Sequence, residues 1–178
     1  MELKIILAGF GGQGILSAGK IVAEAGLIEG REVSWFPSYG PEMRGGTANC
    51  GVIISDSPIG SPVIDACDVL IALNTPSLRK FESRLVTGGT IIVDRSLVAE
   101  DPLRSDLSFY PLEASRVASE RGNMAFATVM LLGCLSSATG CFSRDSFEQS
   151  LRLTLPERHR HLIPVELEIF DQGAVSAR

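Results

Sequence analysis

The chain has few aromatic residues and no excess of positive charge. Aromatic side chains make up 6% of the 178 residues, whereas glycine occurs 18 times. The formal net charge at pH 7 is -5, and a protein that binds nucleic acid needs a basic surface to neutralise phosphates. The composition therefore argues against a nucleic-acid partner and favours a layered α/β fold with tight loops.

The four cysteines follow no metal-binding spacing. Cys50, Cys67, Cys134 and Cys141 form no CxxC pair, so their local spacing builds neither a zinc site nor an iron–sulfur cluster. Scattered thiols of this kind are typical of reduced, buried residues in a cytoplasmic protein. The sequence predicts no bound metal in this chain.

Neither a secretion signal nor a membrane anchor is expected. The first residues form a strand-like run and lack a basic region followed by a long apolar one. Residues 122–143 carry no formal charge, and an uncharged stretch of this length could span a membrane. Their serines, threonines and glycines favour a buried helix instead, so we expect no membrane association.

Short apolar runs alternate with helical patterns along the chain. Strands are predicted at residues 3–8, 33–36, 50–55, 69–73, 90–94 and 107–110. Helices are predicted at residues 15–28, 75–88, 113–120, 124–138, 144–153 and 164–171, the second with Thr75 as its N-cap and ending at Gly88 and Gly89. This order predicts one domain over residues 1–178, a Rossmann-like, doubly wound, mostly parallel sheet with a helical C-terminal third.

The segment Gly9-Phe10-Gly11-Gly12-Gln13-Gly14 has the pattern GxGxxG between a predicted strand and a predicted helix. Free backbone amides and the helix dipole favour a phosphate or carboxylate at such a loop. The predicted cofactor-binding residues are Gly9, Gly11, Gly12, Gln13 and Gly14. The alternative is a crossover of the same shape that binds no ligand.

One feature of a nicotinamide dinucleotide site is missing. Such a site uses an acidic residue at the end of the second strand to hold the ribose hydroxyls. Here that strand leads into Pro37 and Ser38, while Glu29 and Glu32 precede it. A free-standing nucleotide-binding reductase is therefore the weaker hypothesis.

Residues 37–49 form a long segment that is rich in glycine and proline and has no periodicity. Loops of this length inside a compact domain are often functional. The alternative is an ordered surface loop with an internal contact between Glu42 and Arg44. The residues predicted to contact a partner or an anion are Tyr39, Glu42, Arg44, Gly45 and Gly46, together with Asn74 at the end of the fourth strand.

Three segments carry a resemblance to a known family. Residues 9–14, residues 38–46 and the run PVIDACDVLIALN at residues 62–74 together resemble the gamma subunit of 2-oxoacid:ferredoxin oxidoreductases. The likeness runs in order over residues 3–140. A similar domain occurs in indolepyruvate oxidoreductase and within one-chain pyruvate oxidoreductases, so the beta subunit of indolepyruvate:ferredoxin oxidoreductase stays an alternative.

The resemblance implies a role in a multi-subunit enzyme. This family decarboxylates a 2-oxoacid on thiamine diphosphate with Mg, passes electrons through [4Fe-4S] clusters to ferredoxin, and transfers the acyl group to coenzyme A. The implied partners are an alpha subunit, a thiamine-binding beta subunit and a ferredoxin-like delta subunit. Because the chain has neither a thiamine nor a cluster motif, we expect no catalytic residue in it and no activity from it alone.

Two lesser features complete the expectations. His159 and His161 flank Arg160, a cluster that could attract coenzyme A phosphates, although a solvated turn is the favoured interpretation.

The mean hydropathy of +0.23 predicts an exposed apolar patch that partner subunits cover. The isolated chain is therefore expected to form homo-oligomers.

Overall fold

The computed structural model describes residues 1–38 and 47–177. Its strands are β1 (Glu2–Phe10), β2 (Glu32–Ser38), β3 (Thr47–Ser55), β4 (Cys67–Ala72), β5 (Leu85–Asp94) and β6 (Ser108–Leu112). Its α-helices are α1 (Ile15–Ile28), α2 (Thr75–Phe81), α3 (Ala114–Glu120), α4 (Phe126–Thr139), α5 (Arg144–Thr154) and α6 (Ile163–Val175). Two 3-10 helices, η2 (Glu82–Arg84) and η3 (Glu157–Leu162), follow α2 and α5.

The six strands form one sheet in the order β2-β3-β1-β4-β5-β6. β1, β4, β5 and β6 pair in parallel, whereas β3 is antiparallel to both β1 and β2. The chain moves to one side of β1 through β2 and β3, and then to the other side through β4. The switch point of the sheet therefore lies between β1 and β4.

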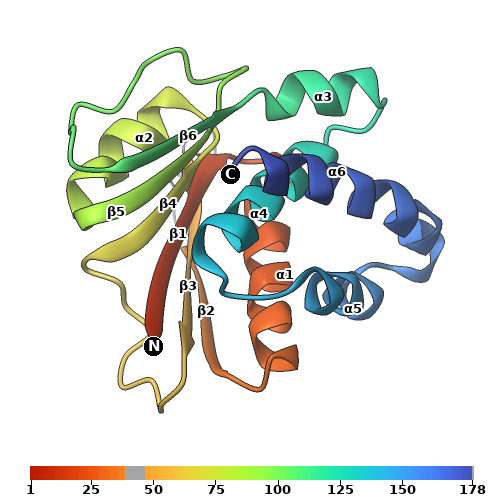
Figure 1. The fold of residues 1–178 in the computed structure, drawn as a ribbon, viewed down its shortest axis with the longest axis horizontal. Coiled ribbons are helices and arrows are strands. Elements are labelled where there is room, and N and C mark those ends of the chain that lie inside the picture. Colours follow the sequence, from red (N-terminus) through yellow and green to blue (C-terminus); the bar gives the residue numbers. More distant parts are fainter. Residues whose placement is uncertain (39–46, 178) are drawn as a thin grey trace.

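Helices cover the two faces of the sheet unequally. α1 and α4 pack on one face of the sheet, α3, α5 and α6 pack against these two helices, and α2 lies on the other face (Figure 1). The larger apolar cluster lies on the first side and the smaller one beneath α2. The α/β class and the helical C-terminal third are confirmed, and the unequal coverage is a feature that the sequence did not predict.

The second predicted helix begins at residue 75 as expected, but its predicted N-cap and its predicted end were wrong. Asn74, and not Thr75, is its N-cap, since the Asn74 side chain accepts a hydrogen bond of 2.8 Å from the Ser77 amide. α2 ends at Phe81, and Gly88 and Gly89 lie inside β5. The register between β4 and β5 shifts between Cys67 and Val69, so the two glycines accommodate an irregular strand and do not terminate a helix.

The uncharged stretch forms α4, a helix with ten consecutive buried residues from Phe126 to Leu135. It crosses α6 so closely that a Cβ added at Gly133 or Gly173 would overlap backbone of the other helix. Within residues 1–38 and 47–177, no helix has both the length and the apolar content to cross a membrane. The predicted buried helix is confirmed.

All four cysteines are free and buried. Burial raises the pKa of the Cys50, Cys67 and Cys134 thiols to about 12 and that of Cys141 to about 11. Thiols of this kind are poor nucleophiles and behave as small apolar side chains. Their predicted place in the core is confirmed.

Candidate functional site

A cavity of about 400 Å³ opens at the carboxyl edge of the sheet, beside the switch point. The glycine loop (residues 11–14) forms one wall, and Leu73 continues it from the end of β4. The opposite wall comes from Leu97, Ser115 and the residues that lead into α4. Two exposed apolar side chains, Leu97 and Met124, are among these lining residues. The cavity is therefore mostly apolar, with backbone amides along one side.

The glycine loop is held in one conformation by its own glutamine. The Phe10 amide donates to Gln13 Oε1 at 2.6 Å, and Gln13 Nε2 donates to the Leu73 carbonyl at 3.4 Å. Gly12 and Gly14 have φ angles of 91° and 78°, a region that favours glycine. Gly9 lies inside β1, where an added Cβ would come within 2.6 Å of Gln13 Oε1. The loop is thus a turn of defined conformation, and its Gln13 side chain links the ends of β1 and β4.

The electrostatics of the loop favour an anion. α1 has 14 residues and begins after Gly14, with no side-chain cap and no acidic residue in its first turn. Its first amides therefore lack an intrahelical acceptor, and the helix dipole adds partial positive charge at this end. A second hollow of about 280 Å³ lies against this first turn, between Phe10 and Ser17. A phosphate or carboxylate group could thus reach the start of α1 from solvent.

A buried carboxylate fixes the opposite wall of the cavity. Asp94 ends β5 and is fully buried, and its Oδ1 accepts the amides of Ser96 and Ser115 at 3.1 Å each. The Ser115 hydroxyl donates to the other oxygen of the same carboxylate. The next residue, Arg95, pairs with Asp101 at 2.7 Å. Asp94 therefore joins the end of β5 to the start of α3.

The predicted site residues are only partly brought together. The four residues of the glycine loop line the cavity, whereas Asn74 is 2% exposed, caps α2 and does not line it. The cross-strand register Ser38–Asn49–Ala8 places the end of β2 at the same edge as the end of β1. The predicted contact residues Tyr39, Glu42, Arg44, Gly45 and Gly46 lie outside the described residues.

Sequence reasoning missed much of the cavity. Leu97, Ser115, Met124 and Ala125 line it, yet they belong to no motif and only their positions after strands or before helices could have indicated them. His159 and His161 lie in η3, where both side chains are exposed. In the part of the chain that the structure describes, no group of three or more His, Cys, Asp or Glu side chains could hold a metal ion.

Comparisons with known proteins agree with this architecture. The model of the pyruvate ferredoxin/flavodoxin oxidoreductase family matches residues 4–175. The chain is 39% identical over 179 residues to the ketoisovalerate oxidoreductase subunit VorA of Methanothermobacter marburgensis, covering 99% of this chain and 37% of that protein. It is 36% identical over 160 residues to the 2-oxoglutarate synthase subunit KorC of Methanocaldococcus jannaschii, covering 88% of this chain and 86% of that protein.

Two solved structures share the fold over 99% of this chain. One is the gamma subunit of a keto/oxoacid ferredoxin oxidoreductase from Geobacter sulfurreducens, with a TM-score of 0.87, 30% identity and 98% of that chain covered. The other is a 2-oxoglutarate:ferredoxin oxidoreductase from Magnetococcus marinus with 2-oxoglutarate, coenzyme A and succinyl-CoA bound, with a TM-score of 0.87, 26% identity and 31% of that chain covered.

The chain belongs to the pyruvate ferredoxin/flavodoxin oxidoreductase family. This confirms the resemblance on which the functional expectations rest. The chain spans 37% of the length of the VorA protein, but 86% of the length of KorC. The same domain therefore occurs both as part of a longer chain and as most of a chain of its own.

Proposed function

We propose that this chain is the gamma subunit of a thiamine-dependent 2-oxoacid:ferredoxin oxidoreductase, inactive alone, and that residues 1–178 act as one domain. Its relatives include subunits named for 2-oxoglutarate synthase and for ketoisovalerate oxidoreductase. Thiamine diphosphate with Mg and the [4Fe-4S] clusters would belong to other subunits of the complex. The partners in this proposal are alpha, thiamine-binding beta and ferredoxin-like delta subunits, with ferredoxin as the electron acceptor, in the cytoplasm.

The observation that carries the proposal for the site is the uncapped start of α1 beside the glycine loop and the cavity at the carboxyl edge. Amide donors at a helix start with no acidic residue in its first turn suit the anionic part of a ligand. Coenzyme A is the candidate, because it is anionic and because a structural neighbour was solved with it bound. The candidate binding residues are Gly9, Gly11, Gly12, Gln13 and Gly14, and the partner contacts proposed from the sequence are Tyr39, Glu42, Arg44, Gly45 and Gly46, without the buried Asn74.

Steady-state kinetics of the assembled enzyme test this site. Gln13→Glu keeps the size of the side chain, places negative charge at the loop and replaces the donor that holds the Leu73 carbonyl. We expect a raised KM for coenzyme A with the KM for the 2-oxoacid unchanged. Gln149→Glu, an exposed change of the same kind on α5, is the matched control. An unchanged KM for coenzyme A in Gln13→Glu would contradict the assignment.

A separate measurement tests the class of protein. The isolated chain is titrated with NAD, NADP and coenzyme A, and the assembled enzyme is assayed with 2-oxoglutarate, ketoisovalerate and pyruvate. We expect turnover only from the assembly and no tight binding of NAD. Tight NAD binding by the isolated chain would instead support a free-standing nucleotide-binding reductase, which the comparisons do not favour.

A further inference from the structure

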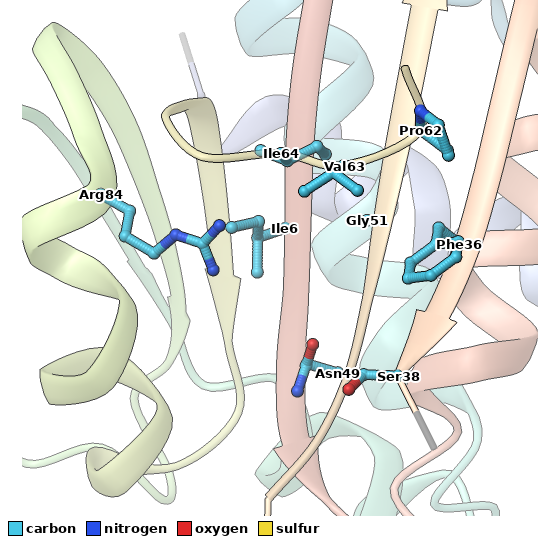
Figure 2. A pocket seen from close by; sticks show the side chains of 9 residues that line it. All are labelled: Ile6, Phe36, Ser38, Asn49, Gly51, Pro62, Val63, Ile64 and Arg84. Atoms are coloured by element: carbon cyan, nitrogen blue, oxygen red, sulfur yellow. The ribbon is translucent and has the colours of Figure 1, made fainter. Parts of the chain in front are cut away.

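Among residues 1–38 and 47–177, no helix packs on the face of the sheet opposite α1 over β2 and β3. On this side α2 packs on β1 and β4, and residues 56–66, the β3–β4 connection, cross above the neighbouring strands (Figure 2). Ile64 of this connection is 5% exposed and packs into the smaller apolar cluster. Val63, the residue before it, is 57% exposed. The connection is therefore anchored on the sheet while it presents an apolar side chain outward.

A groove of about 160 Å³ lies between this connection and the strands. Its shape follows from the sheet register, because Gly51 pairs with Phe36 on one side and with Ile6 on the other. With no side chain at Gly51, the Phe36 ring has no cross-strand neighbour to cover it and is 51% exposed. A Cβ at Gly51 would come within 2.9 Å of Ile64 Cδ1. The glycine thus forms a low floor between two apolar walls.

Polar groups lie at both ends of the groove. Asn49 and Ser38, the cross-strand pair two residues along from Gly51 and Phe36, line one end. Arg84 of η2 reaches toward the other end (Figure 2). Arg84 Nε donates to the Asp65 carbonyl at 3.0 Å, and in the described ranges no carboxylate pairs with its guanidinium. A guanidinium beside an apolar recess is complementary to a carboxylate next to an apolar side chain.

We propose that this groove docks a segment of a partner subunit, with an apolar side chain over Gly51 and a carboxylate on Arg84. The proposal rests on the proposed function, because it requires a multi-subunit enzyme. The groove volume is well below the roughly 300–1,000 Å³ of typical small-molecule pockets, which favours one or two side chains of a protein as its occupant. A second copy of this chain fits less well. A two-fold contact needs a self-complementary patch, but here each recess would face another recess and each Arg84 guanidinium would face a like charge.

Co-purification from the native host tests the groove. The tagged chain is isolated at low and at high salt, and the recovered thiamine-binding and cluster-binding subunits are quantified by mass spectrometry. Val63→Asp should lower their recovery by about tenfold or more, since it places an unpaired charge in a desolvated contact. Leu153→Asp is the matched control, because Leu153 is 65% exposed on α5, on the other side of the sheet. We expect its recovery to equal that of the parent.

The guanidinium is tested in the same assay. Arg84→Gln should lower recovery at low salt and remove the salt dependence, while Arg84→Lys retains part of both, because a surface charge contact is screened by salt. Lys20→Gln, which removes an exposed cation from α1, is the control and should change neither. Melting curves of each isolated variant report whether the chain is still folded.

The outcomes separate this proposal from the proposed function. If the parent recovers partner subunits and Val63→Asp recovers them equally well, the groove proposal is wrong and the proposed function stands. If Val63→Asp instead abolishes self-association of the isolated parent, the occupant is a second copy and the proposal is also wrong. A parent that recovers no such subunit overturns the proposed function and this proposal together. Should Val63→Asp unfold, hydrogen exchange of the parent decides, since unchanged exchange of residues 56–66 on assembly contradicts docking.

Discussion

The two faces of the sheet differ in how completely the chain covers them. On the side of α1, one apolar cluster joins the strands to α3, α4, α5 and α6. A polar contact adds to this packing, because Glu29 after α1 accepts a hydrogen bond of 2.8 Å from the amide of Ser143, the N-cap of α5. On the side of α2, the cluster is smaller and Phe36 and Val63 stay exposed at its border. One face of the sheet is therefore packed against helices over the larger apolar cluster. We interpret the exposed border of the other face as a surface that a partner subunit covers in the assembled enzyme.

The largest difference between the two faces is expected in the free energy of unfolding when one phenylalanine on each side of the sheet is replaced. Phe147 is fully buried and stacks on Phe170 with 4.3 Å between ring centroids. Phe147→Ala should lower the free energy of unfolding by about 4 kcal/mol, because it leaves a cavity in a packed core. Phe36→Ala, on the open face, should change it by less than about 1 kcal/mol. Chemical denaturation of the isolated variants measures both, and equal losses would contradict the difference between the faces.

The close crossing of α4 and α6 gives the next largest effect. An added Cβ at Gly173 would overlap the Met130 carbonyl, so Gly173→Ala should destabilise the chain by about 3 kcal/mol through forced separation of two helices. Gly60→Ala is the control, because no atom lies within 4 Å of its added Cβ and its φ is not positive. It should alter stability by at most about 0.5 kcal/mol. Thermal melting distinguishes the two, and a neutral Gly173→Ala would refute the tight crossing.

A buried acid on the same side gives a pH-dependent effect. Glu166 of α6 is 4% exposed, and its Oε2 has no hydrogen-bond partner in the part of the chain that the structure describes. Burial raises its pKa from 4.5 to about 7. The folded chain therefore binds this proton more tightly than the unfolded chain, so its contribution to stability is full below pH 4.5 and is lost as the pH rises to about 7. Glu166→Gln should stabilise the chain by about 2 kcal/mol at pH 8.

The pH series itself is the check on Glu166. Stability of Glu166→Gln and of the parent should converge as the pH falls toward 5, because the parent carboxyl is then protonated in the folded state. Glu168→Gln, on the same helix but 63% exposed at its side chain and paired with Arg121, should show no such convergence. A constant difference between Glu166→Gln and the parent across the series would mean that the acid stays ionised when folded.

The sequence was sufficient for the sheet's parallel part and for the glycine loop. Apolar runs followed by helical periodicity identify β1, α1 and β4, and the glycine positions alone indicate the turn that Gln13 closes. It was insufficient where a long-range partner decides the local structure. Gly88 and Gly89 look like a helix terminator, but the pairing of β5 with β4 takes them into a strand.

The open groove could not be predicted for the same reason. Its floor depends on Gly51 lying between Phe36 and Ile6, which is a property of the register of β3 and not of any local motif. The capping role of Asn74 was hidden by the neighbouring Thr75-Pro76, an equally good helix start by its residue types. Likewise, the residues after β5 and before α4 meet in the cavity only through the fold.

The smallest expected effect concerns the rates at which the four thiols react. Cys67 belongs to the cluster under α2, whereas Cys50, Cys134 and Cys141 belong to the cluster under α1 and α4. Fewer elements, mainly α2 and the β3–β4 connection, must move away from the sheet to expose the cluster that holds Cys67. Cys67 should therefore react first with an alkylating reagent, through a local opening of the folded chain and not through global unfolding.

All four thiols should react slowly at neutral pH, because burial holds the pKa of each near 11 or 12. Mass spectrometry of the labelled chain orders the rates, with Cys67→Ser as the control that should remove the fastest phase. Equal rates for the four thiols would mean that they are exposed by the same opening and that the α2 side is as firmly closed as the other.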